Sequence, residues 1–300
     1  MDPALEQLGW TEDQWNRICT TVTEEAQRTR VAAQILPVVG PEDPSTVAVP
    51  AYTLTYPAIV PAPLPPLPSL DMEVASDPVL YLTSISALVE LRGREAADPS
   101  LSAALTMFRR AANIIARAED ALVFNGRTAT AINKARGLRA IFGINGLPPI
   151  AVPVAGLLNS PTVAVLPPAF TGTDVATAVF QAIGSLDVAG FSGPYACALD
   201  QAAFDAVCTP NIALVLPRDR ILPFLQGGSL VRASAIPRRV VGVRGAVISL
   251  AGNPVELVVA TDINVSYLQT TASTEMRYVF RVSERVALRI KEPDAIAIIT

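Results

Sequence analysis

Residues 44–80 constrain the fold more than any other part of this sequence, because they combine apolar side chains with repeated proline. Strand-like runs at 47–49, 52–56 and 58–60 lead into prolines at positions 61, 63, 65, 66 and 68. Proline lacks the backbone donor that a sheet ladder needs, so this stretch cannot lie inside a sheet. Linkers that stay in solvent are polar, whereas an extended apolar segment needs a partner surface to cover it. We therefore predict an extended arm or a long two-stranded loop here, with a disordered linker as the alternative.

The composition favours burial against other subunits over contact with nucleic acid or membrane. Half of the 300 residues (51%) are apolar and only 17% are charged, below the about 25% that is typical of soluble proteins. The chain is long enough for one large domain or two small ones, with a sizeable core. Its formal net charge of -4 argues against a nucleic-acid or anionic-membrane partner, because either needs a basic face.

We expect the protein to be soluble and cytoplasmic. The N-terminus has no basic start followed by an apolar core, so it does not resemble an export signal. The most apolar window, 146–170, contains six prolines, which forbid a membrane-spanning helix. Cys19, Cys197 and Cys208 show no CxxC spacing and are expected to be reduced thiols.

Motifs that carry chemistry are nearly absent from the sequence. With no histidine, the chain cannot form a Ser-His-Asp or Cys-His catalytic site, and most zinc sites are excluded. It also lacks glycine-rich phosphate loops and the GxSxG nucleophile elbow. Glu119 and Asp120 are adjacent on a predicted helix, so we expect a salt bridge or a solvated face instead of a working carboxylate pair. Asp262 and Glu284 have no identifiable partner in the sequence. We predict no enzyme activity, no metal and no cofactor, and a monomeric or dimeric enzyme is the least favoured class.

The first predicted helix runs from Thr11 to Pro37. Thr11 and Gln14 form a capping-box pattern, in which a hydroxyl and an amide satisfy backbone groups reciprocally. Apolar residues then follow at spacings of three, four or seven, which make one face of a helix. Pro37 ends the pattern, and Gly40-Pro41 supports that end.

A second predicted helix is long enough to form a spine across a flat domain. Asp98 is its expected N-cap, with Pro99 at the first helical position. Asn125-Gly126 is expected to end it with a left-handed cap. The intervening apolar stripe has helical spacing, and about 25 residues correspond to roughly 37 Å.

The remaining chain is predicted to contain shorter helices and several strands. Helices are expected at 173–186, 201–207 and 218–225. Strands are expected at 195–199, 239–243, 246–250, 255–260, 262–268 and 277–290. The arm, the first helix and the long strand edges leave apolar surface that one subunit cannot bury, and such surface normally marks an interface. The residues alone therefore indicate a self-assembling protein.

Five segments, in order along the chain, resemble the encapsulin shell proteins. They are the Trp15 helix followed by Gly40-Pro41, ARAEDALVFNG at 116–126, GPYA at 193–196, VVATDINVSY at 258–267 and the closing region 278–295. This linocin/bacteriocin-like nanocompartment family has the fold of tailed-phage major capsid proteins. The resemblance implies an α+β fold of that kind, with a peripheral domain, an axial domain and an extended loop.

The resemblance also implies domain boundaries. We expect the N-terminal helix and arm at 1–43 and the extended loop at 44–95. The axial domain is expected at 150–250. The peripheral domain is expected to combine 96–149 with 251–300.

The family's function is implied together with the fold. Members are self-assembling subunits of an icosahedral shell that encloses a cargo enzyme through the cargo's C-terminal targeting peptide. The implied partners are further copies of this chain and a cargo such as a dye-decolorising peroxidase or a ferritin-like protein, with no nucleic acid and no membrane. The alternatives are a phage-type major capsid protein that encloses DNA and a bacteriocin- or protease-type enzyme. The presence of only two lysines and the negative net charge disfavour the first, and the missing catalytic groups disfavour the second.

One implied site is the surface that docks the cargo peptide, on the first helix and the nearby sheet. Matching on Gly40-Pro41, it includes Arg30, Ala33, Gln34 and Pro37, with Ile263 or Val265 from the sheet. In relatives the positions of Ala33 and Pro37 can carry an arginine and an aspartate, so the resemblance implies a more apolar groove here. The alternative is that this helix face is simply packed core.

The other implied site is a pore on the five-fold axis. Its lining residues are Thr209, Pro210, Asn211, Ile212 and Ala213, none of which carries a charge. Charged rings select ions by sign, so an uncharged pore is expected to discriminate weakly, by size. Some relatives hold a flavin near a tryptophan, but the corresponding stretch 86–89 contains none, and no flavin is expected.

Overall fold

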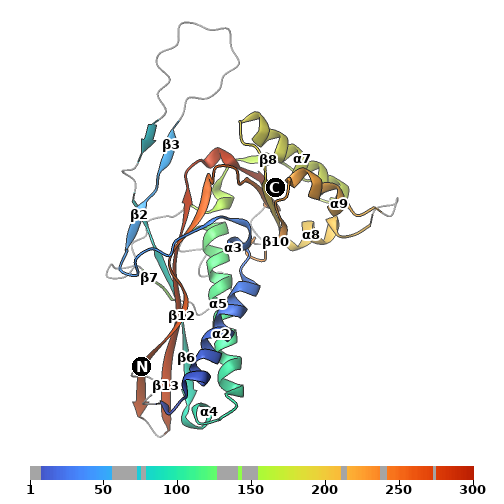
Figure 1. Cartoon of the computed structure of the whole chain (residues 1–300). Helices are drawn as coiled ribbons and strands as arrows, with labels where there is room; N and C mark the ends of the chain where they lie inside the picture. The colour runs from blue at the N-terminus through green and yellow to red at the C-terminus, as the bar shows by residue number, and fades with distance from the viewer. Residues whose placement is uncertain are drawn as a thin grey trace, which may run out of the picture.

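The computed structural model describes residues 8–55, 73–75, 79–126, 141–143, 155–210, 215–236, 242–272 and 275–300. The helices and 3-10 turns of these residues are α2 (Glu12–Thr29), α3 (Ala32–Ile35), α4 (Gly93–Ala96), α5 (Ser102–Asn125), η1 (Leu157–Asn159), α7 (Gly172–Val188), α8 (Gln201–Val207), α9 (Pro217–Ile221), η2 (Leu222–Leu225) and η3 (Pro293–Ala295). The strands are β1 (Val38–Val39), β2 (Ala48–Pro50), β3 (Thr53–Thr55), β4 (Glu73–Ala75), β5 (Val79–Tyr81), β6 (Thr83–Arg92), β7 (Ile141–Gly143), β8 (Thr162–Ala164), β9 (Tyr195–Leu199), β10 (Leu230–Arg232), β11 (Gly245–Ser249), β12 (Val255–Ala272), β13 (Met276–Ile290) and β14 (Ile296–Ile299). They build an elongated sheet covered by helices, a smaller unit at one end and a two-stranded arm (Figure 1).

The elongated part is a five-stranded sheet with the strand order β1-β12-β13-β6-β7. The strands predicted at 255–260 and 262–268 are one strand, because β12 absorbs the irregularity through register shifts between Val259 and Asn264 instead of breaking. β6 lies inside 44–95, the range that the resemblance assigned to the extended loop. Every second side chain of β6 is buried, which is the pattern of a strand with one face on a core, and β6 pairs antiparallel with β13.

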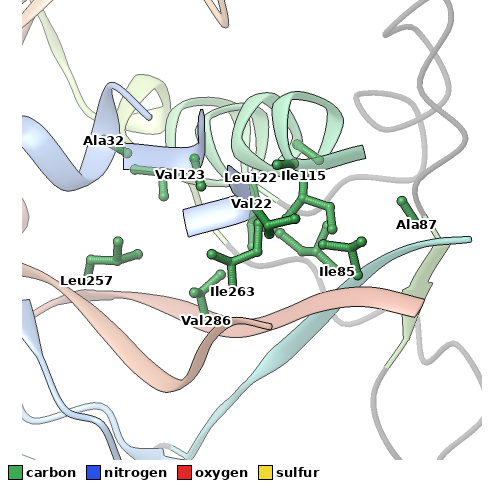
Figure 2. Packing of buried hydrophobic residues seen from close by; sticks show 14 of the residues in the cluster. Val22, Ala32, Ile85, Ala87, Ile115, Leu122, Val123, Leu257, Ile263 and Val286 are labelled. Atoms are coloured by element: carbon green, nitrogen blue, oxygen red, sulfur yellow. The ribbon is translucent and has the colours of Figure 1, made fainter. Parts of the chain in front are cut away.

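Helices α2 and α5 cover one face of this sheet, which we call the helix face (Figure 1). Figure 2 shows Val22 of α2 and Ile115 of α5 close to Ile263 and Val286 of the sheet. All four side chains are buried, so the apolar stripes predicted on both helices face the sheet. Phe280 of β13 closes one end of this core, where its ring meets those of Trp10, Trp15, Phe108 and Tyr267.

The first predicted helix is correct at its start and wrong at its end. The capping box is confirmed, since the Gln14 backbone N–H donates to the Thr11 hydroxyl at 3.2 Å and the Thr11 N–H donates to the Gln14 side chain at 3.0 Å. The helix then breaks at Arg30, whose backbone is extended (φ -60, ψ 130), and resumes as α3. The break follows from hydrogen bonds to Asp120, a residue far away in the sequence.

The spine helix α5 begins later than predicted and ends at the predicted residue. Leu101 has left-handed backbone (φ 54) with a fully buried side chain, so the helix starts only at Ser102. Asp98 does not cap the helix at the predicted place; its carboxylate accepts hydrogen bonds from Ser100 and Ser102 in the preceding turn. Gly126 follows the last helical residue, which confirms where the helix ends, but its backbone (φ 70, ψ -177) lies outside the left-handed helical region, so the predicted left-handed cap is wrong.

The opposite face of the sheet, which we call the arm face, carries the base of the arm. β2 pairs antiparallel with β5, and β3 pairs antiparallel with β4, so the described part of 44–80 is a two-stranded loop, as predicted. The run at 58–60 and the prolines at 61–68 lie outside the described residues. Val49 and Leu82 pack at the base of the arm against Val258, Ala260 and Ala287 of the sheet.

The smaller unit contains a second five-stranded sheet with the order β10-β9-β11-β14-β8. The predicted elements at 173–186, 195–199 and 201–207 are confirmed as α7, β9 and α8. β14 belongs to the range assigned to the peripheral domain, yet it pairs with β11 and β8 in this sheet. All four of its side chains are buried there, so this strand is part of the core of the smaller unit. The strand predicted at 239–243 lies mostly outside the described residues.

None of the described helices combines the length and the apolar composition that crossing a membrane requires.

Candidate functional site

The structure places part of the implied docking surface together, at the end of α2 beside β12, where Arg30 pairs with Asp262 next to Ile263, whereas Val265 lies further along β12 and packs against the core cluster. Arg30 ends α2, Ala33 and Gln34 lie in α3, and Pro37 follows α3. The Pro37 carbonyl accepts a hydrogen bond from the backbone N–H of Leu257 at 2.9 Å, which anchors this segment to the edge of β12. The two elements that sequence analysis grouped together therefore meet in space.

These residues differ in their exposure. Gln34 is exposed, and Ala33, Pro37 and Val265 are half-buried. Ile263 is 7% exposed and packs under α2 and α5, as Figure 2 shows. Arg30 is 8% exposed and held by ion pairs. Only Ala33, Gln34, Pro37 and Val265 therefore have side chains that reach the solvent. Arg30 and Ile263 are buried.

The edge of β12 is open beyond this point within the described residues. β1 pairs with β12 only at Leu257 and Val258, and the Glu42 N–H adds a bond to the Val259 carbonyl at 3.0 Å. Gly40 makes this approach possible, because a Cβ there would lie 2.1 Å from the Val259 carbonyl oxygen. In the described part of the chain, no strand pairs with this edge from Thr261 onwards.

Arg30 lies at the centre of a buried ion-pair group on the helix face. Its Nε is 2.9 Å from Glu119 Oε2 of α5, its Nη1 is 2.8 Å from Asp262 Oδ1 of β12, and its Nη2 is 2.5 Å from Glu284 Oε2 of β13. We call these four residues the helix-face cluster. Burial lowers the pKa of Arg30, but the nearby carboxylates of Glu284, Glu119 and Asp262 outweigh it and raise the pKa above its usual range. Arg30 therefore stays charged and ties the end of α2 to three elements.

Asp120, next to Glu119 on α5, explains why the helix breaks at Arg30. Its carboxylate accepts the backbone N–H of Val31 at 2.9 Å and of Ala32 at 2.8 Å. The N-cap residue Val31 has no side chain that could cap the start of α3. Asp120 therefore supplies the acceptor that the first backbone N–H groups of α3 need. Burial raises the pKa of Asp120 to about 6, although these two hydrogen bonds oppose the shift.

A second group of charges lies on the arm face, and in this group the positive side chains outnumber the negative ones. Glu256 accepts from Arg289 Nε at 2.5 Å and from Lys291 Nζ at 2.8 Å. The guanidinium of Arg285 donates to the carbonyls of Pro44 and Thr46, the latter at 2.6 Å. Arg289 Nη1 also donates to the Pro50 carbonyl at 3.2 Å, and its guanidinium lies 5.2 Å from the ring centre of Tyr52. We call Glu256, Arg285, Arg289 and Lys291 the arm-face cluster. It fixes the base of the arm to the sheet.

The implied pore residues follow α8 in the smaller unit. Thr209 and Pro210 are exposed, and the Thr209 hydroxyl donates to the Asp205 carbonyl at 2.8 Å. Asn211, Ile212 and Ala213 lie outside the described residues.

Sequence reasoning missed both clusters as groups. It gave Glu119 a salt bridge as one possibility, which the contact with Arg30 confirms. It found no partner for Asp262 or Glu284, and both contact Arg30. Arg30 and Glu284 are 254 residues apart, so no local spacing could have paired them.

Comparison with known proteins agrees with this architecture. The model of the family described as "Encapsulating protein for peroxidase" (Linocin_M18) matches residues 6–145 and 139–287. No curated protein matches the chain. Among solved structures, a virus-like particle from Pyrococcus furiosus is similar with a TM-score of 0.68 and 12% identity, covering 97% of this chain and 100% of that one.

Phage capsids show the same fold. The capsid of Myoviridae phage XM1 has a TM-score of 0.58 and 15% identity, covering 88% of this chain and 89% of that one. Mycobacterium phage Bobi has a TM-score of 0.59 and 14% identity, covering 92% and 89%. The resemblance expected from the five segments is thus confirmed for both family and fold. The chain belongs to the Linocin_M18 family of encapsulins, and it is a structural shell subunit with the fold of phage major capsid proteins.

Proposed function

We propose that copies of this chain close into an icosahedral shell in the cytoplasm that encloses a cargo enzyme, held by a short peptide at the C-terminus of the cargo. The match to a family described as encapsulating a peroxidase carries this proposal. A peroxidase of the dye-decolorising type is the favoured cargo, and a ferritin-like protein is the second choice. Further copies of this chain are the other partner, with no nucleic acid and no membrane.

The proposed docking surface combines the exposed side of α3 with the open edge of β12. Ala33, Gln34, Pro37 and Val265 form its surface and carry no charge, which suits an apolar peptide. An open strand edge offers backbone donors and acceptors to an extended peptide, and side-chain pockets beside it supply specificity. Arg30 and Ile263 contribute from below by fixing the positions of α3 and β12.

Co-expression with a tagged cargo tests this surface. A fluorescent protein that carries the C-terminal peptide of a dye-decolorising peroxidase is produced together with the shell, and the ratio of cargo to shell is measured in purified particles. Ala33→Asp is expected to lower loading about tenfold or more, because the buried part of the interface would then hold an unpaired charge. Glu24→Gln, on the exposed side of α2, is the matched control and should load like the wild type.

Two outcomes would contradict the proposal. Equal loading of Ala33→Asp and wild type, in intact particles, would place the docking surface elsewhere. Nucleic acid inside the particles, seen as an ultraviolet spectrum typical of DNA, would favour the capsid alternative.

The uncharged segment 209–213 is proposed to line the pore at the five-fold axis. A charge at Ala213 is expected to change the flux of small ions into the particle without changing assembly. Failure of the Ala213→Asp variant to assemble would show that this segment is an interface instead.

A further inference from the structure

The helix-face cluster holds more negative charge than its guanidinium can balance. If all its carboxyl groups are ionised, three negative charges surround the single positive charge of Arg30. Asp262 is 59% exposed, so water can hydrate its carboxylate. The side chains of Glu119 and Glu284 are 1% and 0% exposed, so water cannot do the same for them. A buried charge without a partner is expensive, and it normally disappears by taking up a proton.

The hydrogen-bond geometry shows which buried carboxylate oxygens of this cluster lack a donor. Among the described residues, no donor reaches either oxygen of Glu119 or the Oε1 of Glu284. The Nε of Arg30 is 2.9 Å from Glu119 Oε2, but it is not aligned to donate. The two carboxyl groups contact Nε and Nη2 of the same Arg30 guanidinium, so they lie side by side. A proton on Glu119 that is donated to Glu284 supplies the missing donor.

The charged groups around this pair come from every element that packs against it. α2 contributes Arg30, and α5 contributes Asp120, which itself lies near the exposed Arg117. β12 contributes Asp262. β6 places Ile85 opposite Glu284, with serines on either side, and thus adds no charge. Arg30 and Arg117 are the only cations in this set of described residues, and Asp120 is already occupied by two backbone N–H groups.

We propose that Glu119 and Glu284 share one proton, and that losing it as the pH rises loosens the joint between α2 and α3, so that the pair is a pH-sensitive latch. Without the proton, two adjacent buried carboxylates repel each other across the junction of α5 and β13. Arg30 already contacts both and cannot neutralise both together with Asp262. The repulsion therefore acts on the contacts that hold the end of α2.

The direction of the pH effect follows from the charges. Burial raises the pKa of Glu284 to about 7, from an ordinary value of 4.5, and burial also raises the pKa of Glu119. A carboxyl group with a raised pKa in the folded state stabilises the fold fully below its unfolded pKa, and this stabilisation is lost as the pH rises through the folded value. The latch is therefore fully closed below the ordinary pKa of 4.5, and it weakens as the pH rises from there through about 7.

Amide hydrogen exchange of empty assembled particles tests the latch without any cargo. Exchange is measured from about pH 5 to about pH 9 and corrected for the intrinsic change of rate. In the wild type, the protection of peptides covering 22–36 should fall about tenfold or more over this range. Peptides from α7, in the smaller unit, report particle integrity and should keep their protection.

Glu119→Gln removes the titrating proton and keeps a donor toward Glu284. In this variant, peptides covering 22–36 should show at most a small part of the wild-type pH dependence. Glu90→Gln is the matched control, because Glu90 forms an exposed ion pair with Arg277 at 3.4 Å, and this variant should behave like the wild type. A wild type with pH-independent protection, or a Glu119→Gln variant with the full wild-type dependence, would overturn the proposal.

Infrared spectroscopy of the wild type decides the matter if Glu119→Gln does not assemble. A carboxylic-acid band from glutamate should remain after exposed carboxyl groups have ionised, and it should disappear at about pH 7 or above. Glutamate labelled with carbon-13 identifies the band. Its absence in assembled particles at about pH 6 would show that the pair holds no proton and would also overturn the proposal.

Discussion

Buried charges are balanced differently on the two faces of the long sheet. On the helix face, one arginine is surrounded by three carboxyl groups. On the arm face, Arg289 and Lys291 share the carboxylate of Glu256, and backbone carbonyls of the arm accept hydrogen bonds from Arg285 and Arg289. Carbonyl oxygens do not titrate in the physiological range, whereas carboxyl groups without enough donors take up protons.

The two clusters, which differ in their acceptors, hold different parts of the subunit in place. The arm-face cluster fixes the base of an arm that projects from the body of the subunit (Figure 1), and neutral acceptors keep that attachment independent of proton uptake. The helix-face cluster fixes the end of α2 beside the proposed docking surface, and its excess of carboxyl groups makes that attachment sensitive to protons.

Arg30→Met should produce the largest effect, because it leaves three carboxyl groups without their shared cation. Removing one partner from a buried ion pair typically lowers the free energy of unfolding by about 3–5 kcal/mol. Calorimetry of assembled particles should show a correspondingly lower melting temperature, partly recovered in acid, where the carboxyl groups are neutral. Arg28→Met is the control, because the Arg28 side chain is 73% exposed. Equal melting of the two variants would mean that Arg30 does not hold the joint.

Arg289→Met should have a smaller effect, since Lys291 still contacts Glu256 after the change. We expect a loss of about 1–3 kcal/mol, the usual penalty for hydrogen bonds left unmade by buried polar groups. The same variant should increase amide exchange in Ala48–Pro50, because Arg289 also holds the Pro50 carbonyl. A loss as large as that of Arg30→Met would remove the contrast between the two faces.

Asp120→Asn should have the smallest effect at neutral pH, below about 1 kcal/mol, because an amide oxygen can still accept the N–H groups of Val31 and Ala32. The pH dependence is the sharper readout. Burial raises the pKa of Asp120 to about 6 from 3.8, so in the wild type its contribution to stability falls as the pH rises between these values. The melting temperature of the variant should therefore change less over that range. If the melting temperature of the variant depends on pH as strongly as that of the wild type, Asp120 is not part of the titrating region.

Sequence patterns predicted most of the elements that depend on local periodicity. The two-stranded arm followed from its proline content, the capping box at Thr11 from spacing, and the end of α5 from Gly126. The break at Arg30 was not predictable in this way. It is imposed by Asp120, which is 88 residues from Ala32 along the chain, and local propensity contains no trace of that contact.

The same reason limits what sequence could say about the candidate site. The resemblance named Arg30 and Pro37, which do contact β12, yet it could not distinguish exposed residues from buried ones, and the docking role of the set stays a prediction. Arg30 is buried because Glu119, Asp262 and Glu284 converge on it from three elements. Such long-range pairing appears only when the sheet and the helices are assembled.

Electron microscopy of the purified chain is the most direct test of its role as a shell subunit. Images should show closed, hollow particles of many copies, with protein density inside when the cargo is co-expressed. A population of single chains that stays folded and monomeric at all concentrations would contradict that role.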